Sequence, residues 1–407
     1  MILLSKNPIA ARFSLALLVG TPLAAQAPLT EADAVSRALG RPEWQALTRL
    51  PSEQATGAAL EARAWLSPSL EWSRESFTGI QPGKREDTYL LTQGVDVSGR
   101  WWARREGALR REEAGRADTQ VRTAGVVAQT RDAFFEVLVA QERVTRLDRA
   151  LARLQKAQTR VDRLHEAGEM SGLERGRVRR EVEILLGRQA QERAALVRAR
   201  VRLVALLDQP LEGVEATLLP PAPEPLDAVE TRLKGSATTA LTQAQEAAAQ
   251  ADAKAAGRWF PELIIGVGVK RWQENGLSGN GSVFSLGLAL PTPGRVQGAR
   301  RRAEAEARAA AAQAKLQRAQ DTAEVRALWQ EVTDLRASAL RLGQETQEPA
   351  KVEAALDAAF EAGELDLLAR LDGARTLLDA ELAALDQAHR ARRAGIALDR
   401  LLGKVNP

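Results

Sequence analysis

The chain has 407 residues, 27% of them charged, and its 57 Lys and Arg nearly balance its 53 Asp and Glu to leave a net charge of +4. Such a small basic excess, interleaved with acidic residues, indicates solvated helix faces and argues against a nucleic-acid-binding stripe. With no cysteine and only two histidines, His165 and His389, the sequence offers no disulfide framework, no thiolate metal site and no lipid-modified cysteine.

Residues 1–27 have the pattern of an export signal. Lys6 and Arg12 precede a short apolar run, and Ala25-Gln26-Ala27 has the small residues of a cleavage site. The run is far shorter than the roughly 20 residues that a membrane-spanning helix needs, as is every later apolar stretch. We therefore predict a signal peptide over 1–27 that is cleaved after Ala27, rather than a membrane anchor.

The rest of the sequence contains an internal repeat. At an offset of 194 or 195 residues, several groups of residues recur in the same order. They include Gly99-Arg100 with Gly294-Arg295, Phe134 with Trp329, and Glu166-Ala167-Gly168-Glu169 with Glu361-Ala362-Gly363-Glu364. We therefore expect two structural repeats, 28–219 and 226–407. The segment 220–225 between them holds four prolines, which exclude a helix or a central strand, so we predict a linker there.

Both repeats have the same order of predicted elements. In the first, a helix runs to about residue 65, a β-hairpin covers 69–98, and a very long helix and a return helix follow. The proline-free stretch from Arg100 to His165 predicts a single helix of about 100 Å. Helices of this length are typical of rods or tubes. The second repeat places its hairpin at 261–291 and repeats the long helix and its return.

The long helices of the first repeat have the pattern of a coiled coil. Apolar residues on both arms alternate at spacings of three and four, as in a left-handed seam. The series comprises Val144, Leu147, Leu151, Leu154, Gln158, Val161 and His165 on the outgoing arm, and Val178, Val182, Leu185, Gln189, Glu192, Leu196, Ala199, Leu203 and Leu206 on the return arm. Gly168 and Gly172 mark the reversal, so we predict tips near 165–173 and, in the second repeat, near 360–368.

The predicted hairpins have the alternation of membrane β-strands. The apolar members are Leu263, Ile265, Val267, Val269, Phe284, Leu286, Leu288 and Leu290 in the second repeat, and Leu70, Tyr89, Leu91, Val95 and Val97 in the first. Alternation over about ten residues turns one face toward lipid and the other toward a lumen. Trp72, Trp272 and the pair Trp101-Trp102 are candidate interfacial aromatics. A soluble sheet packed on the helices is the alternative interpretation.

A membrane sheet of this size requires an oligomer. Four strands per chain leave two open edges, and lipid does not tolerate unpaired backbone groups. Bacterial barrels begin at about eight strands, so one chain cannot close a barrel. Three chains would supply twelve strands, with the helical rods continuing the tube beyond the membrane. The predicted fold is therefore mainly α, with long helical hairpins and a four-strand contribution from each protomer to a trimeric barrel.

Several of these features together resemble the TolC family of outer-membrane efflux proteins. The motifs that carry the resemblance are Leu29-Thr30-Glu31-Ala32-Asp33-Ala34-Val35, Trp65-x-x-Pro68-x-Leu70, Glu166-Ala167-Gly168-Glu169 and Glu361-Ala362-Gly363-Glu364-Leu365-Asp366-Leu367-Leu368. The resemblance covers essentially the whole mature chain. It implies a homotrimer in the outer membrane with a helical tunnel in the periplasm, which joins a periplasmic membrane-fusion adaptor and an inner-membrane pump of the RND type. The chain would conduct substrates passively.

Two further segments resemble the heavy-metal branch of that family, the cobalt–zinc–cadmium type. They are Gln93-Gly94-Val95-Asp96-Val97-Ser98-Gly99-Arg100 and Leu290-Pro291-Thr292-Pro293-Gly294-Arg295-Val296-Gln297-Gly298. The second has Thr292-Pro293 where that branch usually has an apolar pair with an aromatic, and the first lacks a proline before its helix. The branch implies metal cations as the cargo.

Two sets of candidate functional residues lie near the predicted tips. The adaptor-docking set comprises Gly168, Glu169, Met170, Ser171, Gly363, Glu364, Leu365 and Asp366, and the alternative is that its glycines merely cap helices. The aperture set comprises Asp357 and Glu361 with their counterparts Asp162 and Glu166. Three copies of these carboxylates would form rings that favour cations. Alternatively, they lie on a solvated face, paired with Lys351 or Arg163.

Catalysis is not expected, because no acid, base and nucleophile converge in the sequence. His165-Glu166 lacks the second histidine of a zincin helix, and the isolated histidines offer no metal site. Gly266 and Gly268 are followed by more strand, so they form no dinucleotide loop. We expect no cofactor. The principal rival function is a periplasmic coiled-coil adaptor or a structural protein, which would explain the long hairpin but neither the repeat nor the strand pairs.

Overall fold

The computed structural model describes residues 28–77, 83–258, 262–290, 292–345 and 349–405, so the predicted signal peptide lies outside the described residues. The helices are α1 (Glu31–Gly40), α2 (Pro42–Arg63), α3 (Arg100–Glu166), α4 (Gly172–Leu207), α5 (Leu226–Lys234), α6 (Ala237–Gly257), α7 (Pro293–Glu345), α8 (Pro349–Glu361) and α9 (Leu367–Leu401). The strands are β1 (Ser69–Ser76), β2 (Arg85–Val95), β3 (Glu262–Glu274) and β4 (Leu277–Ala289).

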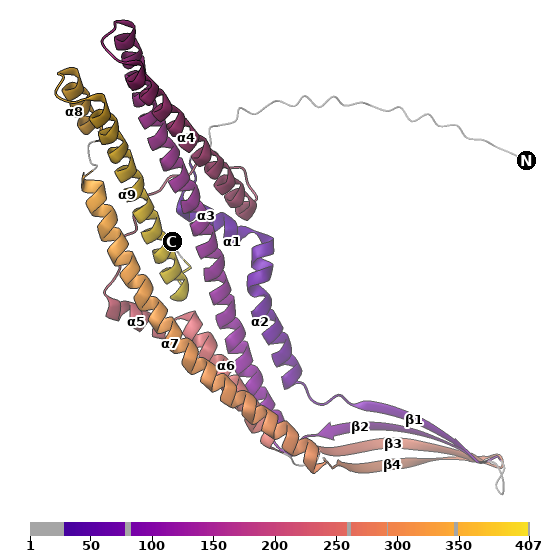
Figure 1. Ribbon diagram of the computed structural model, residues 1–407. Coiled ribbons are helices and arrows are strands. Elements are labelled where there is room, and N and C mark those ends of the chain that lie inside the picture. The colour runs from indigo at the N-terminus through magenta and orange to yellow at the C-terminus, as the bar shows by residue number, and fades with distance from the viewer. Residues whose placement is uncertain (1–27, 78–82, 259–261, 291, 346–348, 406–407) are drawn as a thin grey trace, which may run out of the picture.

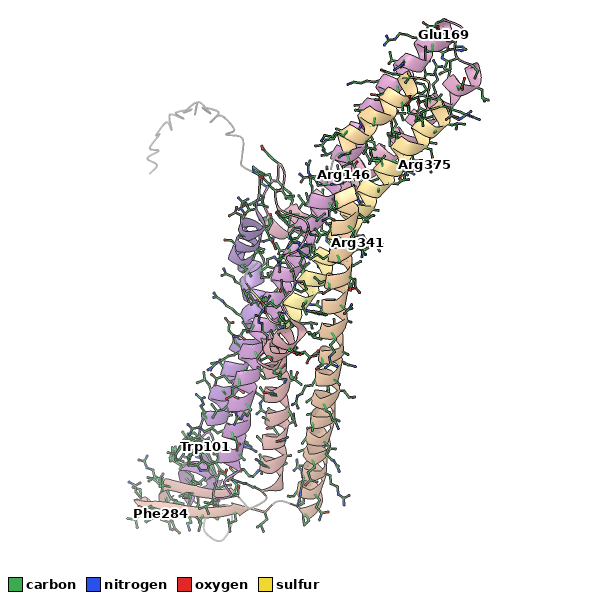
Figure 2. The ribbon with its side chains drawn as sticks, turned by 90° about the vertical axis from the view of Figure 1, so that its left-hand side faces the viewer. Trp101, Arg146, Glu169, Phe284, Arg341 and Arg375 are labelled. Carbon is green, nitrogen blue, oxygen red and sulfur yellow. The ribbon has the colours of Figure 1, made fainter. Side chains whose placement is uncertain are left out.

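The molecule is a long helical rod with a sheet at one end (Figure 1). Helix α3 alone has 67 residues and extends for about 100 Å. Figure 2 shows Glu169 at the tip of the rod, and Trp101 and Phe284 at the opposite end, beside the sheet. Among the described residues, no helix combines the length and the apolar character that a membrane crossing requires.

The helices beside the sheet follow the same order as its strands. In the sheet the order is β1-β2-β3-β4, with every neighbouring pair antiparallel. In the rod, α2 packs on α3, α3 on α6 and α6 on α7. Each strand is thus joined to one helix of a single curved layer, and α2 and α7 form the edges of that layer just as β1 and β4 form the edges of the sheet. Toward the tip, α4 and α9 pack on α3, and α9 also packs on α7.

Small residues allow the helices of this layer to approach closely. A Cβ atom on Gly115 of α3 would lie 2.6 Å from the Cβ of Ala55 in α2, and one on Gly107 would lie 2.8 Å from a carboxylate oxygen of Asp252 in α6. Helix α6 buries a stripe of alanines at every third or fourth position. Close contact through glycine and alanine gives a wall that is one helix thick.

The apolar core is divided into clusters along the rod. The predicted seam is buried near the tip, where Leu147, Leu151 and Val161 of α3 pack against Val178 and Val182 of α4. Halfway along the rod, a second cluster surrounds Phe134 and Phe135, both fully buried. A third and smaller cluster lies in the second repeat and includes Val229, Leu233 and Val325, with Trp329 packed against it.

Three expectations are corrected by the structure. The helix predicted to run to about residue 65 is two helices, because the chain bends at Arg41 and Pro42 begins α2. The long helix of the second repeat ends at Glu345, and a separate α8 begins at Pro349. Gly172 is the first residue of α4 rather than part of the reversal.

Candidate functional site

One face of the sheet is apolar over the rows nearest the rod, whereas toward the hairpin turns the same face carries Arg74, Asp87 and Arg271 in one row. Register places Leu70, Leu91, Val267 and Phe284 in one row across the four strands, and Phe284 is 82% exposed. Neighbouring rows on this face add Trp72, Tyr89, Val269, Ile265, Leu286, Leu263 and Leu288. No helix of the described part of the chain covers this face (Figures 1 and 2). An uncovered apolar face of this size requires a nonaqueous neighbour.

The opposite face is polar and rich in glycine. Its rows contain Glu71 with Gly268, Thr88 with Lys270, and Thr92 with Gly266. Glu86 forms ion pairs with Lys270 and with Lys84. A Cβ atom on Gly268 would lie 2.2 Å from the backbone oxygen of Tyr89, so the paired strand β2 leaves no room for a side chain there. This face has the composition of a water-filled lumen.

Of the predicted interfacial tryptophans, Trp272 is on the other face. It shares its row with Glu86 and Gly279, and a Cβ atom on Gly279 would lie 2.7 Å from the indole ring. Its position two residues beyond Lys270 requires this orientation, because side chains alternate along a strand. Trp72 does lie in the apolar rows, opposite Tyr89. Trp272 therefore lies outside the apolar rows to which Trp72 belongs.

The two tips close with the same backbone geometry. Gly168 and Gly363 both have left-handed backbones, with φ of 80° and 74°. In each tip, the residue after the glycine donates its N–H to a carbonyl five residues earlier: Glu169 to Leu164 at 2.9 Å, and Glu364 to Ala359 at 3.0 Å. These are Schellman motifs, which favour glycine at the left-handed position. A Cβ atom on either glycine would have no neighbour within 4 Å, so both tips are open on the outside.

The remaining docking candidates divide into exposed groups and groups that hold the turn. Glu169 and Glu364 are exposed. Ser171 forms a capping box with Glu174 at the start of α4, and Asp366 caps α9 by accepting the N–H of Ala369 at 2.7 Å. Met170 and Leu365 are half-buried, and Met170 packs against the seam cluster. The tips therefore present mainly glycine and carboxylate surfaces.

The aperture candidates lie among arginines. Asp357 accepts hydrogen bonds from Arg370 of α9 at 2.8 and 2.5 Å, and Glu361 pairs with Arg160 of α3. Asp162 accepts from Arg175 of α4 at 2.6 Å, and this hydrogen bond lowers the pKa of Asp162. Glu166 is exposed at the end of α3. The partners that the sequence proposed, Lys351 and Arg163, are not those seen for Asp357 and Glu361.

The two histidines occupy different environments. His165 donates from Nδ1 to the carbonyl of Met170 at 2.8 Å, which fixes the first tip. His389 is half-buried in α9, and burial, together with the charges of Arg393 and Arg143, lowers its pKa. Within the described ranges, no three acidic or histidine side chains are grouped as they would be for metal binding.

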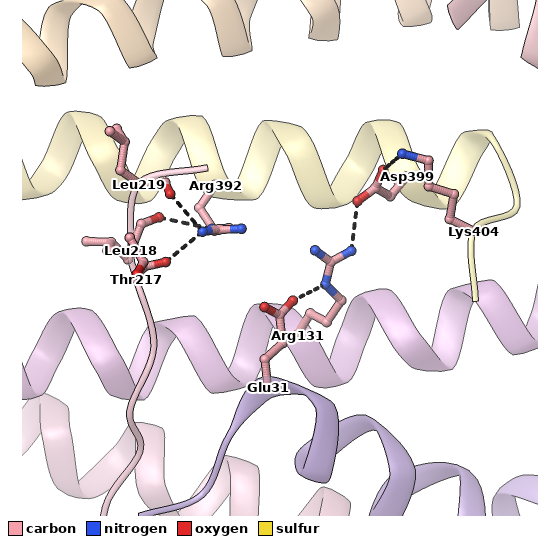
Figure 3. A network of polar contacts seen from close by, with 8 residues as sticks. All are labelled: Glu31, Arg131, Thr217, Leu218, Leu219, Arg392, Asp399 and Lys404. Atoms are coloured by element: carbon pink, nitrogen blue, oxygen red, sulfur yellow. Dashed lines mark hydrogen bonds and ion pairs between the residues drawn. The ribbon is translucent and has the colours of Figure 1, made fainter. Parts of the chain in front are cut away.

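A polar network that the sequence did not predict joins the two repeats (Figure 3). Arg131 of α3, only 6% exposed, contacts Glu31 of α1 at 2.5 Å and Asp399 of α9 at 2.9 Å. Arg392 donates to three consecutive carbonyls, of Thr217, Leu218 and Leu219, at 2.6 to 3.0 Å. One feature of the sequence could have predicted this network. Arg131 lies inside an apolar stretch, and a buried arginine requires a buried partner.

The sequence matches no family model. It is similar to the cobalt-zinc-cadmium resistance protein CzcC of Cupriavidus metallidurans, with 28% identity over 400 residues that cover 94% of this chain and 92% of CzcC. It is also similar to the nickel-cobalt-cadmium resistance protein NccC of Alcaligenes xylosoxydans xylosoxydans, with 26% identity over 247 residues that cover 59% of this chain and 55% of NccC.

Solved structures of outer-membrane channels have the same fold. The outer membrane protein VceC of Vibrio cholerae gives a TM-score of 0.78 at 16% identity, over 92% of this chain and 96% of that one. CusC gives 0.75 at 17% identity over 91% of each chain. The CmeC outer membrane channel of Campylobacter jejuni gives 0.76 at 13% identity, over 99% of this chain and 94% of that one. The predicted resemblance to TolC-family channels is therefore confirmed, and with it the fold class.

Proposed function

We propose that this chain, with its TolC-type fold, is the outer-membrane duct of a tripartite efflux system and conducts metal cations passively out of the periplasm. The observation that carries the proposal is the two-faced sheet at the end of a helical wall. Its apolar face suits lipid, its polar face suits a lumen, and both lie in register with helices that would continue the same tube. No acid–base constellation is part of this mechanism.

The open edges of the sheet support a homotrimer. Among the described residues, no strand pairs with the outer sides of β1 and β4, and a bilayer excludes the water that could satisfy their backbone groups. The edge helices carry exposed leucines as well, with Leu47 and Leu60 of α2 at 55% and 63% and Leu316 of α7 at 65%. Pairing β4 and α7 of one protomer with β1 and α2 of the next would cover both kinds of edge and close twelve strands.

The tips are the proposed docking surface for a periplasmic membrane-fusion adaptor, which in turn engages an inner-membrane pump. They are the ends farthest from the sheet and the two places where the helical wall reverses with open space around a glycine. Glu169, Glu364 and the capping groups at Ser171 and Asp366 surround these glycines. An adaptor helix could therefore approach the backbone closely.

The choice of metal cations as cargo is supported by similarity to CzcC and NccC, both named for metal resistance. On the lumen face of the sheet, Glu71, Glu86 and Glu262 stand with the single lysine Lys270 among the described strand residues. Repeated three times, this face would be acidic and would favour cations over anions.

The test combines assembly with resistance. The purified protein should have the mass of a trimer in detergent, and deleting it from its host should lower tolerance to cobalt, zinc or cadmium until the chain is supplied again. A stable monomer, extracted without detergent, would instead support the periplasmic adaptor or structural alternative. A trimer whose loss leaves metal tolerance unchanged would remove the metal cargo and retain the duct.

A further inference from the structure

A cation without a carboxylate partner lies where the sheet meets the rod. The guanidinium of Arg105 in α3 is 5.6 Å from the ring centre of Trp101 and 5.7 Å from that of Trp102. The two indoles contact each other edge to face at 4.7 Å. Among the described residues no carboxylate pairs with Arg105, although most arginines of α3 have one. The two rings hold the charge in place but do not neutralise it.

This cation lies on the outer side of the wall. Gly107 faces α6 and Gly115 faces α2, and at 100° per residue these directions are about 80° apart around α3. On the same wheel, Trp102, Arg105 and Leu109 centre on the side opposite to both neighbours. In a curved layer of helices that side is convex and faces outward. Trp102 is 63% exposed and Leu109 is 39% exposed, so the stripe is accessible.

A groove lined by the two indoles that contact Arg105 leads to the apolar face of the sheet. It has a volume of about 210 Å³, and its lining comprises Trp65, Leu66, Gly94, Val95, Asp96, Trp101 and Trp102. The carboxylate of Asp96 already accepts hydrogen bonds from Ser98 and from the backbone N–H of Trp101. Val95 shares a row with Leu263 and Leu288 and so belongs to the apolar face. The side chain of Trp65 is itself 75% exposed. Apolar surface, indoles and a cation therefore follow one another in the order of acyl chain, interface and headgroup in a bilayer leaflet.

We propose that Arg105, Trp102 and the adjoining groove bind a glycerophospholipid of the periplasmic leaflet, with the phosphodiester on Arg105 and the acyl chains along the Val95 row. The proposal rests on the proposed outer-membrane location. Arg105 is suited to this role because guanidinium groups bind phosphate oxygens in a bidentate manner. Stacking on two indoles fixes the plane of the fork, which lowers the entropy lost when the lipid binds. Three such sites per trimer would fix the height of the barrel in the membrane.

The site can be tested by native mass spectrometry of trimers extracted from outer membranes, titrated with phosphatidylglycerol and phosphatidylethanolamine. Three phospholipids should remain bound to each wild-type trimer. Arg105→Gln and Trp102→Ala should each weaken their retention about tenfold, a loss of ~1.4 kcal/mol per site. Arg116→Gln is the matched control, because Arg116 lies on the same stripe three turns farther from the sheet and already pairs with Glu112 at 2.5 Å. It should bind as the wild type does.

A second measurement covers the case in which Trp102→Ala reduces the yield of trimers. Trp102→Phe keeps a ring beside Arg105, and in vesicles of brominated phospholipid it should show less quenching of tryptophan fluorescence than the wild type. Equal retention by Arg105→Gln and the wild type, or binding of lipopolysaccharide alone, would overturn the lipid site and leave the duct intact. Recovery of the chain from the inner membrane would overturn both.

Discussion

The two helical hairpins differ in what holds them, although their tips are alike. The first consists of one unbroken α3 and its return α4, joined by a buried apolar seam. The second has two outgoing helices, α7 ending at Glu345 and α8 beginning at Pro349, and α8 has no buried residue among those described. Charged contacts predominate there: Glu353 and Glu361 of α8 pair with Arg153 and Arg160 of α3, and the half-buried Phe360 packs against the seam cluster. The second hairpin therefore depends on the first.

This difference identifies the part of the tunnel that can move at low cost. Buried apolar contacts contribute about 25 cal/mol for each Å² removed from water, whereas an exposed ion pair such as that of Glu361 with Arg160 contributes ~1 kcal/mol or less. Phe360 adds contacts with the guanidinium groups of Arg160 and Arg370 at 5.5 and 6.0 Å. Helix α8, held in this way, can separate from α3 while the first hairpin stays closed.

The largest expected effect concerns the tip glycines, which both hairpins have. Replacing both Gly168 and Gly363 with phenylalanine should abolish adaptor crosslinking and efflux while leaving the trimer intact. The new side chains meet open space, so their cost to folding is limited to about 1–2 kcal/mol each for a left-handed backbone. Crosslinking in membranes measures docking, and trimer mobility without heating controls for folding. Undiminished crosslinking would show that the glycines serve only as helix caps.

The next prediction compares equivalent aromatics of the two repeats. Phe134 is fully buried in its cluster, so Phe134→Ala should cost about 3–5 kcal/mol per protomer. Trp329 is half-buried and donates from its indole nitrogen to the carbonyl of Glu224 at 2.7 Å. Trp329→Ala should cost less, because less surface leaves water when it packs. The thermal midpoints of purified trimers check the order, and a larger loss for Trp329→Ala would reverse it.

The sequence was sufficient for much of this architecture because its signals are periodic. The seam from Leu147 to Leu206, the alternation around Val267 and the glycine at 168 each depend on residues close together in the chain. It was insufficient where distant segments meet. Arg131 finds Asp399 across 268 positions, and Arg160 finds Glu361 across 201. Charged residues on long helices look alike in sequence, so their partners are decided only by packing.

Pro349, the first residue of α8, was a local signal of another kind in the sequence. Pro349 lacks the N–H that a continuing helix needs, and it is well suited to the first position of a new one. We nevertheless expected one very long helix, because alanine, arginine and glutamate dominate the sequence on both sides of Pro349. Pro349 alone could therefore have predicted that a new helix begins there. That ion pairs hold this helix, α8, to α3 depends on tertiary contacts and could not be predicted.

A stabilisation that is lost as the pH rises should appear in α8 of the second hairpin, through Glu353. Burial, with the charges of Glu381 and Asp357, raises the pKa of Glu353 above its ordinary value of 4.5, despite its pairing with Arg153 at 2.5 Å. A raised pKa means that the packed arm binds the proton more tightly than a detached arm does. The stabilisation is thus fully present below pH 4.5 and is lost as the pH rises through the raised value.

Amide hydrogen exchange of residues 349–361 would measure this effect. Relative to Glu353→Gln at the same pH, the wild type should exchange faster at pH 7 and similarly near pH 4.5, the ordinary value for this side chain. Glu364→Gln, at the exposed tip, is the control and should follow the wild type. Equal exchange of the wild type and Glu353→Gln at neutral pH would mean that the arm is held by contacts other than this carboxyl.

The smallest effect is expected from the aperture carboxylates, because each already has a cationic partner. Asp357 is bound by Arg370, and Glu361 by Arg160, so their charges are largely balanced while the arm is packed. Neutralising them with Asn and Gln should lower cation selectivity and divalent block about twofold at most, since exposed pairs contribute ~1 kcal/mol or less. Single-channel conductance in planar bilayers measures both, with Asp162→Asn as the comparison in the firmer hairpin. If selectivity and block stay unchanged in the Asp357 and Glu361 variant, these carboxylates form no ring around the axis, and the acidic face of the sheet would then be the remaining source of cation preference.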